Sequence, residues 1–329
     1  MTDSQSLKNL VLVTGAAGFI GSRVAESCRE QGLAVLAVDQ EGFFQDRAEH
    51  LPYLKPERIV DMDRLFDVLK SGELKGKIAS IIHMGACTDT TELDEAYLKR
   101  VNIEYSQKLW TYAAQEKIPF VYASSAATYG DGAQGYTDDE SQISKLKPLN
   151  PYGESKRLFD LWALEQEKQG HTPPVWAGFK FFNVYGFGER HKGKMASVVM
   201  HSFDQISAGK EVRLFKSHRA GIADGEQMRD FVFVDDVVEV LQFARKGGIK
   251  RGIFNLGSGK ARSFHDLARA TFRALGKPEQ IQFIDMPMEL RERYQYFTEA
   301  QMSRLKTAGY IKPFTSLEDG VAKYVARLK

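Results

Sequence analysis

Cysteine is scarce in this chain, which has two among its 329 residues. Cys28 lies inside a predicted helix and Cys87 follows a predicted strand, so the pair forms neither a disulfide framework nor a metal-ligand spacing. The seven histidines also show no ligand spacing with one another or with the cysteines. We therefore expect no metal site, and a reducing compartment fits best.

Long apolar runs and a strong charge of one sign are missing as well. No apolar run reaches the roughly 18 residues that a membrane span requires, and residues 1–8 are short and polar, unlike a secretory signal. The 45 basic and 43 acidic residues leave a formal net charge of +2, which is too small to draw the whole surface to nucleic acid or anionic lipid. These absences favour a cytoplasmic protein without nucleic acid or membrane as a partner.

The first half of the chain alternates strand-like apolar runs with helical patterns. Such alternation predicts a parallel sheet covered by helices on both faces, which is a doubly wound (Rossmann) α/β fold. The predicted strands are Leu10–Thr14, Ala34–Val38, Ser80–Met84, Phe120–Ser124 and Val175–Phe181. The predicted helices are Ile20–Gln31, Arg64–Lys70, Leu93–Glu116 and Pro151–Lys168.

The pattern loosens after residue 182. Gly186–Met195 and Lys216–Arg229 are rich in glycine and charge and predict loops. We interpret residues 1–182 as the first domain and residues 183–329 as mostly a second, smaller and partly interleaved α/β domain. A segment of about residues 230–252 is expected to return to the first domain, because Phe231–Val234 is apolar enough to join its sheet.

Gly15, Gly18 and Gly21 follow the first predicted strand and open the first predicted helix. Here glycine allows a sharp turn, lets a pyrophosphate approach the backbone and lets helix and strand pack closely, while amides at the helix N-terminus bind the anion. Asp39 ends the second predicted strand and would accept hydrogen bonds from an adenosine ribose, which favours NAD. Four basic residues downstream could instead neutralise the 2′-phosphate of NADP, so the choice between NAD and NADP stays open. They are Arg47, Lys55, Arg58 and Arg64.

Tyr152 and Lys156 stand four residues apart in the helix that begins at Pro151, so they share one face of it. An ammonium beside a phenol lowers a pKa that starts near 10, which lets tyrosine act as a general base. Ser125, with Ser124, ends the fourth predicted strand and places a hydroxyl where it can bond a reacting substrate oxygen. This constellation predicts proton transfer next to a bound dinucleotide.

With these motifs at these separations, the chain resembles the extended short-chain dehydrogenase/reductase family, whose members act largely on nucleotide sugars. The resemblance covers nearly the whole chain, and the family's catalytic serine or threonine, tyrosine and lysine fall on Ser125, Tyr152 and Lys156. It makes residues 1–182 the dinucleotide-binding domain and the later residues mostly the substrate domain. The cofactor positions it implies are Gly15, Gly18, Phe19, Ile20, Gly21, Asp39, Gln40, Arg64, Met84, Gly85, Ala86, Cys87, Thr88, Asn102, Tyr152, Lys156, Val184 and Lys192.

Four segments are similar to one branch of that family, the ADP-glyceromanno-heptose 6-epimerases: His83–Glu92, Tyr122–Gly130, His191–Ser197 and Arg293–Thr298. The branch oxidises C6 of an ADP-heptose to a ketone and reduces it again on the opposite face. It generally uses tightly bound NADP despite an acidic residue like Asp39. Lys192 matches a lysine that is either a second acid/base or a cofactor ligand. The substrate positions implied are Ser125, Asn183, Lys194, His201, Phe215, Lys216, Ser217, His218, Arg229 and Tyr294.

Two departures from the branch concern the substrate. Lys194 stands where the familiar bacterial member of the branch has serine, and the segment from Lys216 to Met228 is longer than its counterpart there, so the sugar is predicted by resemblance alone. A 4,6-dehydratase is disfavoured, because it would carry acidic residues after its catalytic serine, where this chain has Ala126 and Ala127. A UDP-hexose 4-epimerase stays open. A non-catalytic dinucleotide sensor finds less support because the catalytic residues are all present, and the family favours a homo-oligomer.

Overall fold

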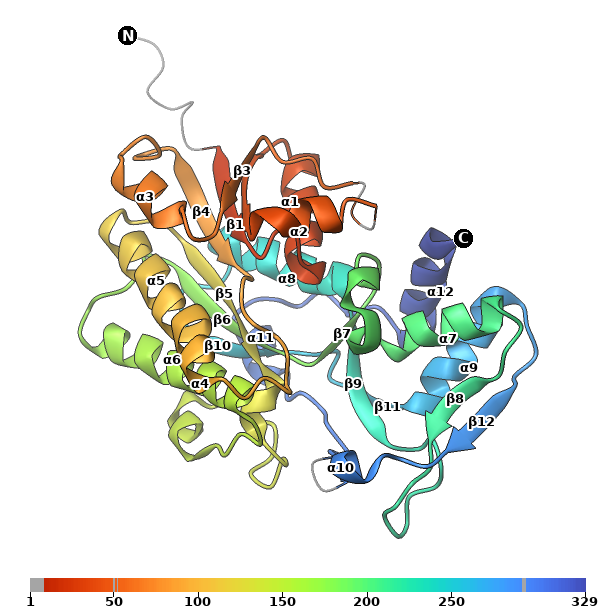
Figure 1. Cartoon of the computed structure of the whole chain (residues 1–329). Helices are drawn as coiled ribbons and strands as arrows, with labels where there is room; N and C mark the ends of the chain where they lie inside the picture. The colour runs from red at the N-terminus through yellow and green to blue at the C-terminus, as the bar shows by residue number, and fades with distance from the viewer. Residues whose placement is uncertain (1–8, 50, 52, 292–293) are drawn as a thin grey trace.

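The centre of the molecule is a seven-stranded sheet, in the order β10-β6-β5-β4-β1-β2-β3 (Figure 1). The structure is a computed structural model that describes residues 9–49, 51, 53–291 and 294–329. Every neighbouring pair in this sheet is parallel, which confirms the predicted doubly wound fold. The strands are β1 (Leu10–Thr14), β2 (Ala34–Asp39), β3 (Arg58–Asp61), β4 (Ile78–His83), β5 (Phe120–Ser125), β6 (Trp176–Phe181) and β10 (Ile253–Leu256).

Helices cover both faces of this sheet. Because both faces are buried, the strands have continuous apolar sequences. In β1, Val11 and Val13 belong to one buried cluster and Leu12 to the other, because successive side chains of a strand point to opposite faces. One face is covered by α1 (Phe19–Glu30), α8 (Val234–Arg245) and α11 (Ser303–Thr307). The other is covered by α3 (Leu65–Lys70), α5 (Tyr105–Gln115) and α6 (Pro151–Lys168).

The long helix predicted from Leu93 to Glu116 contains a change of helical pitch. It begins as α4 (Glu95–Leu98), capped by the Asp94 side chain, widens to a π-helix over Lys99–Glu104 and continues as α5. Its apolar side packs on the sheet through Leu109 and Trp110, among others. Asn102 is buried within the π-helical stretch, and such widening is frequent at functional sites.

The second half of the chain builds a smaller unit beside the sheet, at the right of Figure 1. A three-stranded sheet contains β7 (Asn183–Tyr185), β9 (Met228–Phe233) and β11 (Ala261–Ser263), and a two-stranded sheet contains β8 (Val212–Phe215) and β12 (Ile281–Ile284). The helices α7 (Val198–Ser207), α9 (Phe264–Leu275) and α12 (Leu317–Leu328) pack with them around shared apolar clusters. Two short helices, α2 (Glu41–Asp46) and α10 (Met288–Arg291), lie in connecting segments.

The prediction that Phe231–Val234 joins the main sheet is wrong. Residues 231–233 belong to β9, which pairs with β7 and β11, and the seventh strand of the main sheet is β10. The helix that follows, α8, packs on β4 and β5 of the main sheet. Apolar character predicts that a strand is buried but not which sheet it joins. The proposed division at residue 182 remains a prediction.

Candidate active site

The candidate site lies at the carboxyl edge of the main sheet, at the point where the strand order reverses. β1 has β2 on one side and β4 on the other, so the segments after β1 and β4 diverge and leave a crevice, the usual ligand position in this fold. Gly15 follows β1, Asp39 ends β2, Met84 follows β4 and Ser125 ends β5. Four predicted site segments therefore meet at one edge.

The glycine loop fits a pyrophosphate. Gly15 has a φ of +65°, and a Cβ there would lie 2.7 Å from the backbone nitrogen of Gly85, while a Cβ on Gly21 would lie 2.0 Å from the carbonyl oxygen of Gly15. The loop, the start of α1 and the segment after β4 are thus in backbone contact. The first turn of α1, which carries Phe19 and Ile20, has neither an acidic residue nor a side-chain cap. Its amides remain for an anionic ligand.

Asp39 lies beside a cation at the end of β2. Its carboxylate accepts hydrogen bonds from the backbone nitrogens of Ala17 (3.0 Å) and Gln40 (2.9 Å). Burial raises its pKa, and Arg47 acts in the opposite direction. The Arg47 guanidinium donates to the carbonyl of Ala17 at 3.0 Å and lies 3.7 Å from the ring centroid of Phe43. Of the other predicted residues here, Gln40 and Arg64 are exposed.

The predicted catalytic pair, Tyr152 and Lys156, lies in the first turns of α6. Asn150 caps the helix by accepting a hydrogen bond from the backbone nitrogen of Gly153 at 2.8 Å, and Pro151 occupies the first turn, so the local sequence fixes where the helix begins. Tyr152 and Lys156 are both buried. The Lys156 ammonium donates to the carbonyl of Ala123 at 2.9 Å. Burial lowers the pKa of Lys156 to about 8, against the opposing charge of Asp160.

The pKa of Tyr152 departs from the prediction. Burial raises this pKa, a side-chain hydrogen bond with Ser125 lowers it, and the charge of Cys87 raises it. Lys156 is not among these causes, and its ammonium is bonded to the β5 backbone. The structure does not show the expected lowering by Lys156, and it shows a contact between Ser125 and the phenol that the sequence did not predict.

Asn102 joins the segment after β4 to the catalytic helix. Its side-chain oxygen accepts from the nitrogen of Cys87 at 2.8 Å, and its side-chain nitrogen donates to the carbonyl of Cys87 (3.1 Å) and the hydroxyl of Ser155 (2.9 Å). Ser155 in turn donates to the carbonyl of Tyr152 at 2.7 Å. Met84 is buried in this segment. Its other predicted cofactor residues run from half-buried to exposed: Gly85, Ala86, Cys87 and Thr88.

Three predicted substrate residues form an aromatic-cation cluster on the smaller unit. The buried Arg229 donates to the carbonyl of Met228 at 2.9 Å, and its guanidinium carbon lies 5.0 Å from the ring centroid of Tyr294. Burial lowers the pKa of this guanidinium. The rings of Tyr294 and Phe215 are 6.5 Å apart. The cluster has the forked donor and the stacking surface that suit a nucleotide diphosphate.

The longer segment after β8 is held to the chain around it. Lys216 pairs with Asp285 at 3.4 Å, and the backbone nitrogen of Ser217 donates to Asp224 at 2.7 Å. The backbone nitrogen of His218 donates to the hydroxyl of Tyr296 at 3.0 Å. These contacts place the segment next to Tyr294 and Tyr296. Arg293, at the start of that motif, lies outside the described residues.

Other predicted substrate residues are not joined to this cluster. Lys194 is exposed, and neither it nor the half-buried His201 on α7 makes a side-chain hydrogen bond or ion pair within the described chain. Asn183 is exposed at the start of β7 and is followed by the half-buried Val184. Their assignments rest on the resemblance.

Lys192 lies nearer the cofactor loop. Its ammonium is 5.6 Å from the ring centroid of Phe19, at the start of α1, and burial lowers its pKa while Glu189 raises it. Glu189 is fully buried and accepts hydrogen bonds from the nitrogen of Gly186 (3.2 Å) and from both the nitrogen and the hydroxyl of Ser197 (2.6 Å each). This carboxylate anchors the loop that carries Lys192.

Several residues of the site were not found from the sequence. Tyr136 donates to the carbonyl of Phe297 at 2.6 Å, and Gln295 bonds to the carbonyl of Gly130. These contacts attach the segment carrying Tyr294 to the loop after Ser125. They join residues more than 150 positions apart, and no local spacing signals such pairs. Glu189 was missed for the same reason, since its charge alone predicts a solvated loop.

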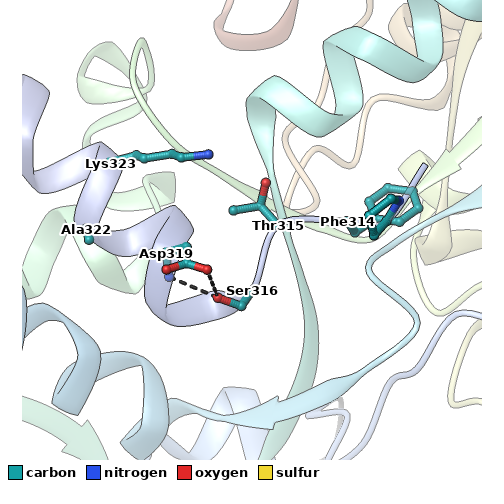
Figure 2. Close-up of a pocket in the computed structure, with 7 residues that line it drawn as sticks. Phe314, Thr315, Ser316, Asp319, Ala322 and Lys323 are labelled. Atoms are coloured by element: carbon teal, nitrogen blue, oxygen red, sulfur yellow. Dashed lines mark hydrogen bonds between the residues drawn. The ribbon is translucent and has the colours of Figure 1, made fainter.

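A separate groove lies beside the start of α12 (Figure 2). Ser316 caps that helix and bonds to Asp319, and Lys323 extends along the groove. None of the predicted site residues lines it. Among the residues that the structure describes, no group of histidine, cysteine and acidic side chains could hold a metal, and no helix has the length and apolar character needed to cross a bilayer.

A family model described as the NAD dependent epimerase/dehydratase family matches residues 11–257. The chain belongs to this family. Membership of this family supports a nicotinamide dinucleotide as the cofactor.

The chain is also similar to individual members of this family that carry the same enzyme name. The chain is 45% identical to the ADP-L-glycero-D-manno-heptose-6-epimerase of Fusobacterium nucleatum, over 96% of this chain and 97% of that protein. It is 43% identical to the protein of the same name from Nitratidesulfovibrio vulgaris, with 97% of each chain covered. A crystal structure of the Helicobacter pylori ADP-L-glycero-D-manno-heptose-6-epimerase superposes with a TM-score of 0.80 at 27% identity, covering 99% of this chain and 98% of that chain.

Proposed function

We propose that this protein inverts C6 of the heptose in ADP-glycero-manno-heptose. The observation that carries the proposal is the meeting of Ser125, Tyr152 and Lys156 with the glycine loop at one sheet edge. Relatives named for this activity, at 43–45% identity over nearly the whole chain, support the choice of substrate. The cluster of Arg229, Tyr294 and Phe215 supplies a surface for the diphosphate end.

The reaction oxidises C6 to a ketone and reduces it again from the other face. A bound nicotinamide ring supplies the acceptor and donor of one hydride. Tyr152 takes the proton of the C6 hydroxyl, while Ser125 holds the reacting oxygen through its own hydroxyl. Because burial raises the pKa of Tyr152, its phenolate needs a nearby cation, and Lys156 lies four residues along the same helix. Ala126 and Ala127 offer no acid for elimination.

NADP is the cofactor we propose. Arg47 supports it, because this guanidinium lies by the Ala17 carbonyl at the end of β2, next to the carboxylate that would hold a ribose. Arg47→Gln should weaken NADP binding about 10-fold or more, the usual effect of removing a hydrogen bond to a charged group, and leave NAD binding unchanged. Calorimetry with each dinucleotide measures this. An equal loss of affinity for NADP and for NAD would show that Arg47 does not determine which cofactor binds.

Lys192 is the second acid/base in this proposal. Its position beside Phe19 also makes it a possible cofactor ligand, and one variant separates the two roles. As an acid/base, Lys192→Met should lose most of kcat and keep its dinucleotide dissociation constant. A raised dissociation constant with proportionate loss of activity would assign it to cofactor binding instead. Lys210→Met, which removes an exposed lysine outside the predicted site residues, is the control.

The experiment that tests the function offers two substrates to the purified protein. ADP-D-glycero-manno-heptose should give the product inverted at C6, identified by NMR, and UDP-galactose should remain unchanged. Inversion at C4 of UDP-galactose, with no change in the heptose, would make this a hexose 4-epimerase. Tyr152→Phe should lose most turnover while still holding cofactor, whereas a non-catalytic dinucleotide sensor would lose nothing. Cytoplasmic location and homo-oligomer formation remain predictions.

A further inference from the structure

His83 occupies a fully enclosed position between the cofactor loop and the catalytic helix. It ends β4, is 3% exposed, and hydrogen-bonds through both ring nitrogens: Nδ1 with the Thr14 hydroxyl at 2.6 Å and Nε2 with the Ser106 hydroxyl at 2.8 Å. Thr14 ends β1, and Ser106 begins α5 just after the π-helical stretch. One imidazole therefore connects two strands of the sheet with a helix.

The other hydrogen bonds of these two hydroxyls determine which atom donates the proton in each bond to His83. Thr14 accepts from the backbone nitrogen of Gly85 at 3.0 Å, and Ser106 donates its only hydroxyl proton to the carbonyl of Asn102 at 2.7 Å. Ser106 must therefore accept from Nε2–H of His83. Nδ1 then accepts the proton of Thr14. Only the neutral Nε2–H tautomer satisfies all four bonds, and a doubly protonated ring would leave the Thr14 proton without an acceptor.

The burial of the ring agrees with this assignment. Desolvation and, to a smaller extent, the nearby charge of Lys156 lower the pKa of His83 to about 3. The ring stays neutral at physiological pH and keeps one tautomer. Aromatic neighbours enclose it, with the rings of Tyr105 and Phe120 each centred 6.0 Å away.

Both ends of this series of hydrogen bonds lie at the candidate active site. At one end, Gly85 lies in backbone contact with Gly15 of the cofactor loop. At the other, Asn102 bonds through its side chain to Ser155, which bonds to the carbonyl of Tyr152. The first end therefore lies at the predicted cofactor loop, and the second lies at the predicted catalytic tyrosine.

We propose that His83 is a positioning residue that sets the catalytic helix relative to the cofactor loop through this directed chain, which we name the His83 chain (Gly85, Thr14, His83, Ser106 and Asn102). The inference rests on the proposed dinucleotide and catalytic sites and is independent of the sugar. Hydride transfer is sensitive to such placement, because a misplacement of about 1 Å can cost ~100-fold in rate.

The test begins with Thr14→Val, which keeps the shape of the side chain and removes its hydroxyl. We expect kcat to fall about 10-fold, for a displacement smaller than 1 Å, with KM and the dinucleotide dissociation constant within about twofold. Thr14→Ser restores the hydroxyl and should recover kcat. Ser80→Ala is the control, because Ser80 lies on β4, the strand of His83, is buried, and has no hydrogen-bond partner within the described chain. It should behave like the wild type.

Ser106→Ala interrupts the chain on the other side of the ring. If the chain acts as one unit, the double variant Thr14→Val/Ser106→Ala should be no slower than the slower single variant, rather than the product of the two effects. Hydrogen–deuterium exchange on the intact protein should show faster exchange in residues 84–88 and at the start of α6 in each slow variant. This readout needs no sugar, so it separates failure of the inference from failure of the proposed substrate.

Four results would overturn the inference: wild-type kcat in Thr14→Val, a Thr14→Ser variant as slow as Thr14→Val, an equal loss in Ser80→Ala, or multiplicative effects in the double variant. If Thr14→Val does not fold, Ser106→Ala measured by kcat and exchange decides the question alone. Unchanged exchange at the start of α6 in that variant would contradict the proposal.

Discussion

The buried ion pair beneath the catalytic helix allows a quantitative prediction. Asp160 on α6 and Lys180 on β6 are both fully enclosed, with 2.6 Å between their charged atoms. The carboxylate also accepts hydrogen bonds from the hydroxyls of Tyr122 (3.0 Å) and Ser124 (2.7 Å), and the ammonium also donates to Thr128 at 2.8 Å. Asp160 thereby fastens the helix that carries Tyr152 and Lys156 to the neighbouring strands.

Asp160→Asn should lower the free energy of unfolding by about 3–5 kcal/mol, the usual cost of leaving a buried charge without its partner. The amide can still accept from one of the two hydroxyls, so the loss comes chiefly from the uncompensated ammonium of Lys180. The double variant Asp160→Asn/Lys180→Met removes that ammonium and should recover most of the loss. Tyr122 and Ser124 then account for the remainder, about 1 kcal/mol for each weakened hydrogen bond.

Urea unfolding monitored by circular dichroism measures these differences through the shift in midpoint at constant slope. Glu165→Gln is the matched control on the same helix, because the pair of Glu165 and Lys168 is 52% and 75% exposed, and exposed pairs contribute about 0–1 kcal/mol. A loss below about 1 kcal/mol in Asp160→Asn would refute the reasoning, since the penalty for a buried unpaired charge is larger. A double variant as unstable as the sum of its single variants would refute it as well.

The remaining predictions concern the glycine loop, the catalytic lysine and their controls. Gly21→Ala should weaken dinucleotide binding at least ~10-fold, because its Cβ would lie 2.0 Å from the Gly15 carbonyl oxygen, whereas Gly42→Ala, with no atom nearer than 4.0 Å, should bind normally in calorimetry. Because the pKa of Lys156 falls from 10.5 to about 8, the unfolded chain binds more protons than the folded chain between these pH values. The free energy of unfolding of the wild type, relative to Lys156→Met, should therefore rise with pH across this window in denaturant titrations. A pH-independent difference would contradict this assignment.

Local patterns in the sequence predict the parts of the site that depend on strand ends and helix starts. The strand before Gly15, the acid at Asp39 and the face shared by Tyr152 and Lys156 all follow from spacing, and the carboxyl edge of a parallel sheet brings them together. The cap of α6 by Asn150 is of the same kind, since it joins residues three apart.

Contacts between distant segments could not be predicted in this way. His83 bonds to Thr14 across 69 positions, and the Lys180 partner of Asp160 lies on a different element. A single sequence shows the type of each residue but not which segments meet. The pKa of Tyr152 is a further example, because helix spacing places Lys156 near the phenol but does not reveal that its ammonium bonds to Ala123 or that burial dominates.

Isotope tracking at C6 tests the central claim, which is that one hydride leaves C6 and returns to the opposite face of the same sugar. The substrate carries deuterium at C6, the protein is used with its bound cofactor, and the product is examined by NMR and mass spectrometry in ordinary water. The account predicts a product inverted at C6 that keeps its deuterium, with no net change in cofactor oxidation state. Loss of deuterium to solvent, or inversion at another carbon, would contradict it.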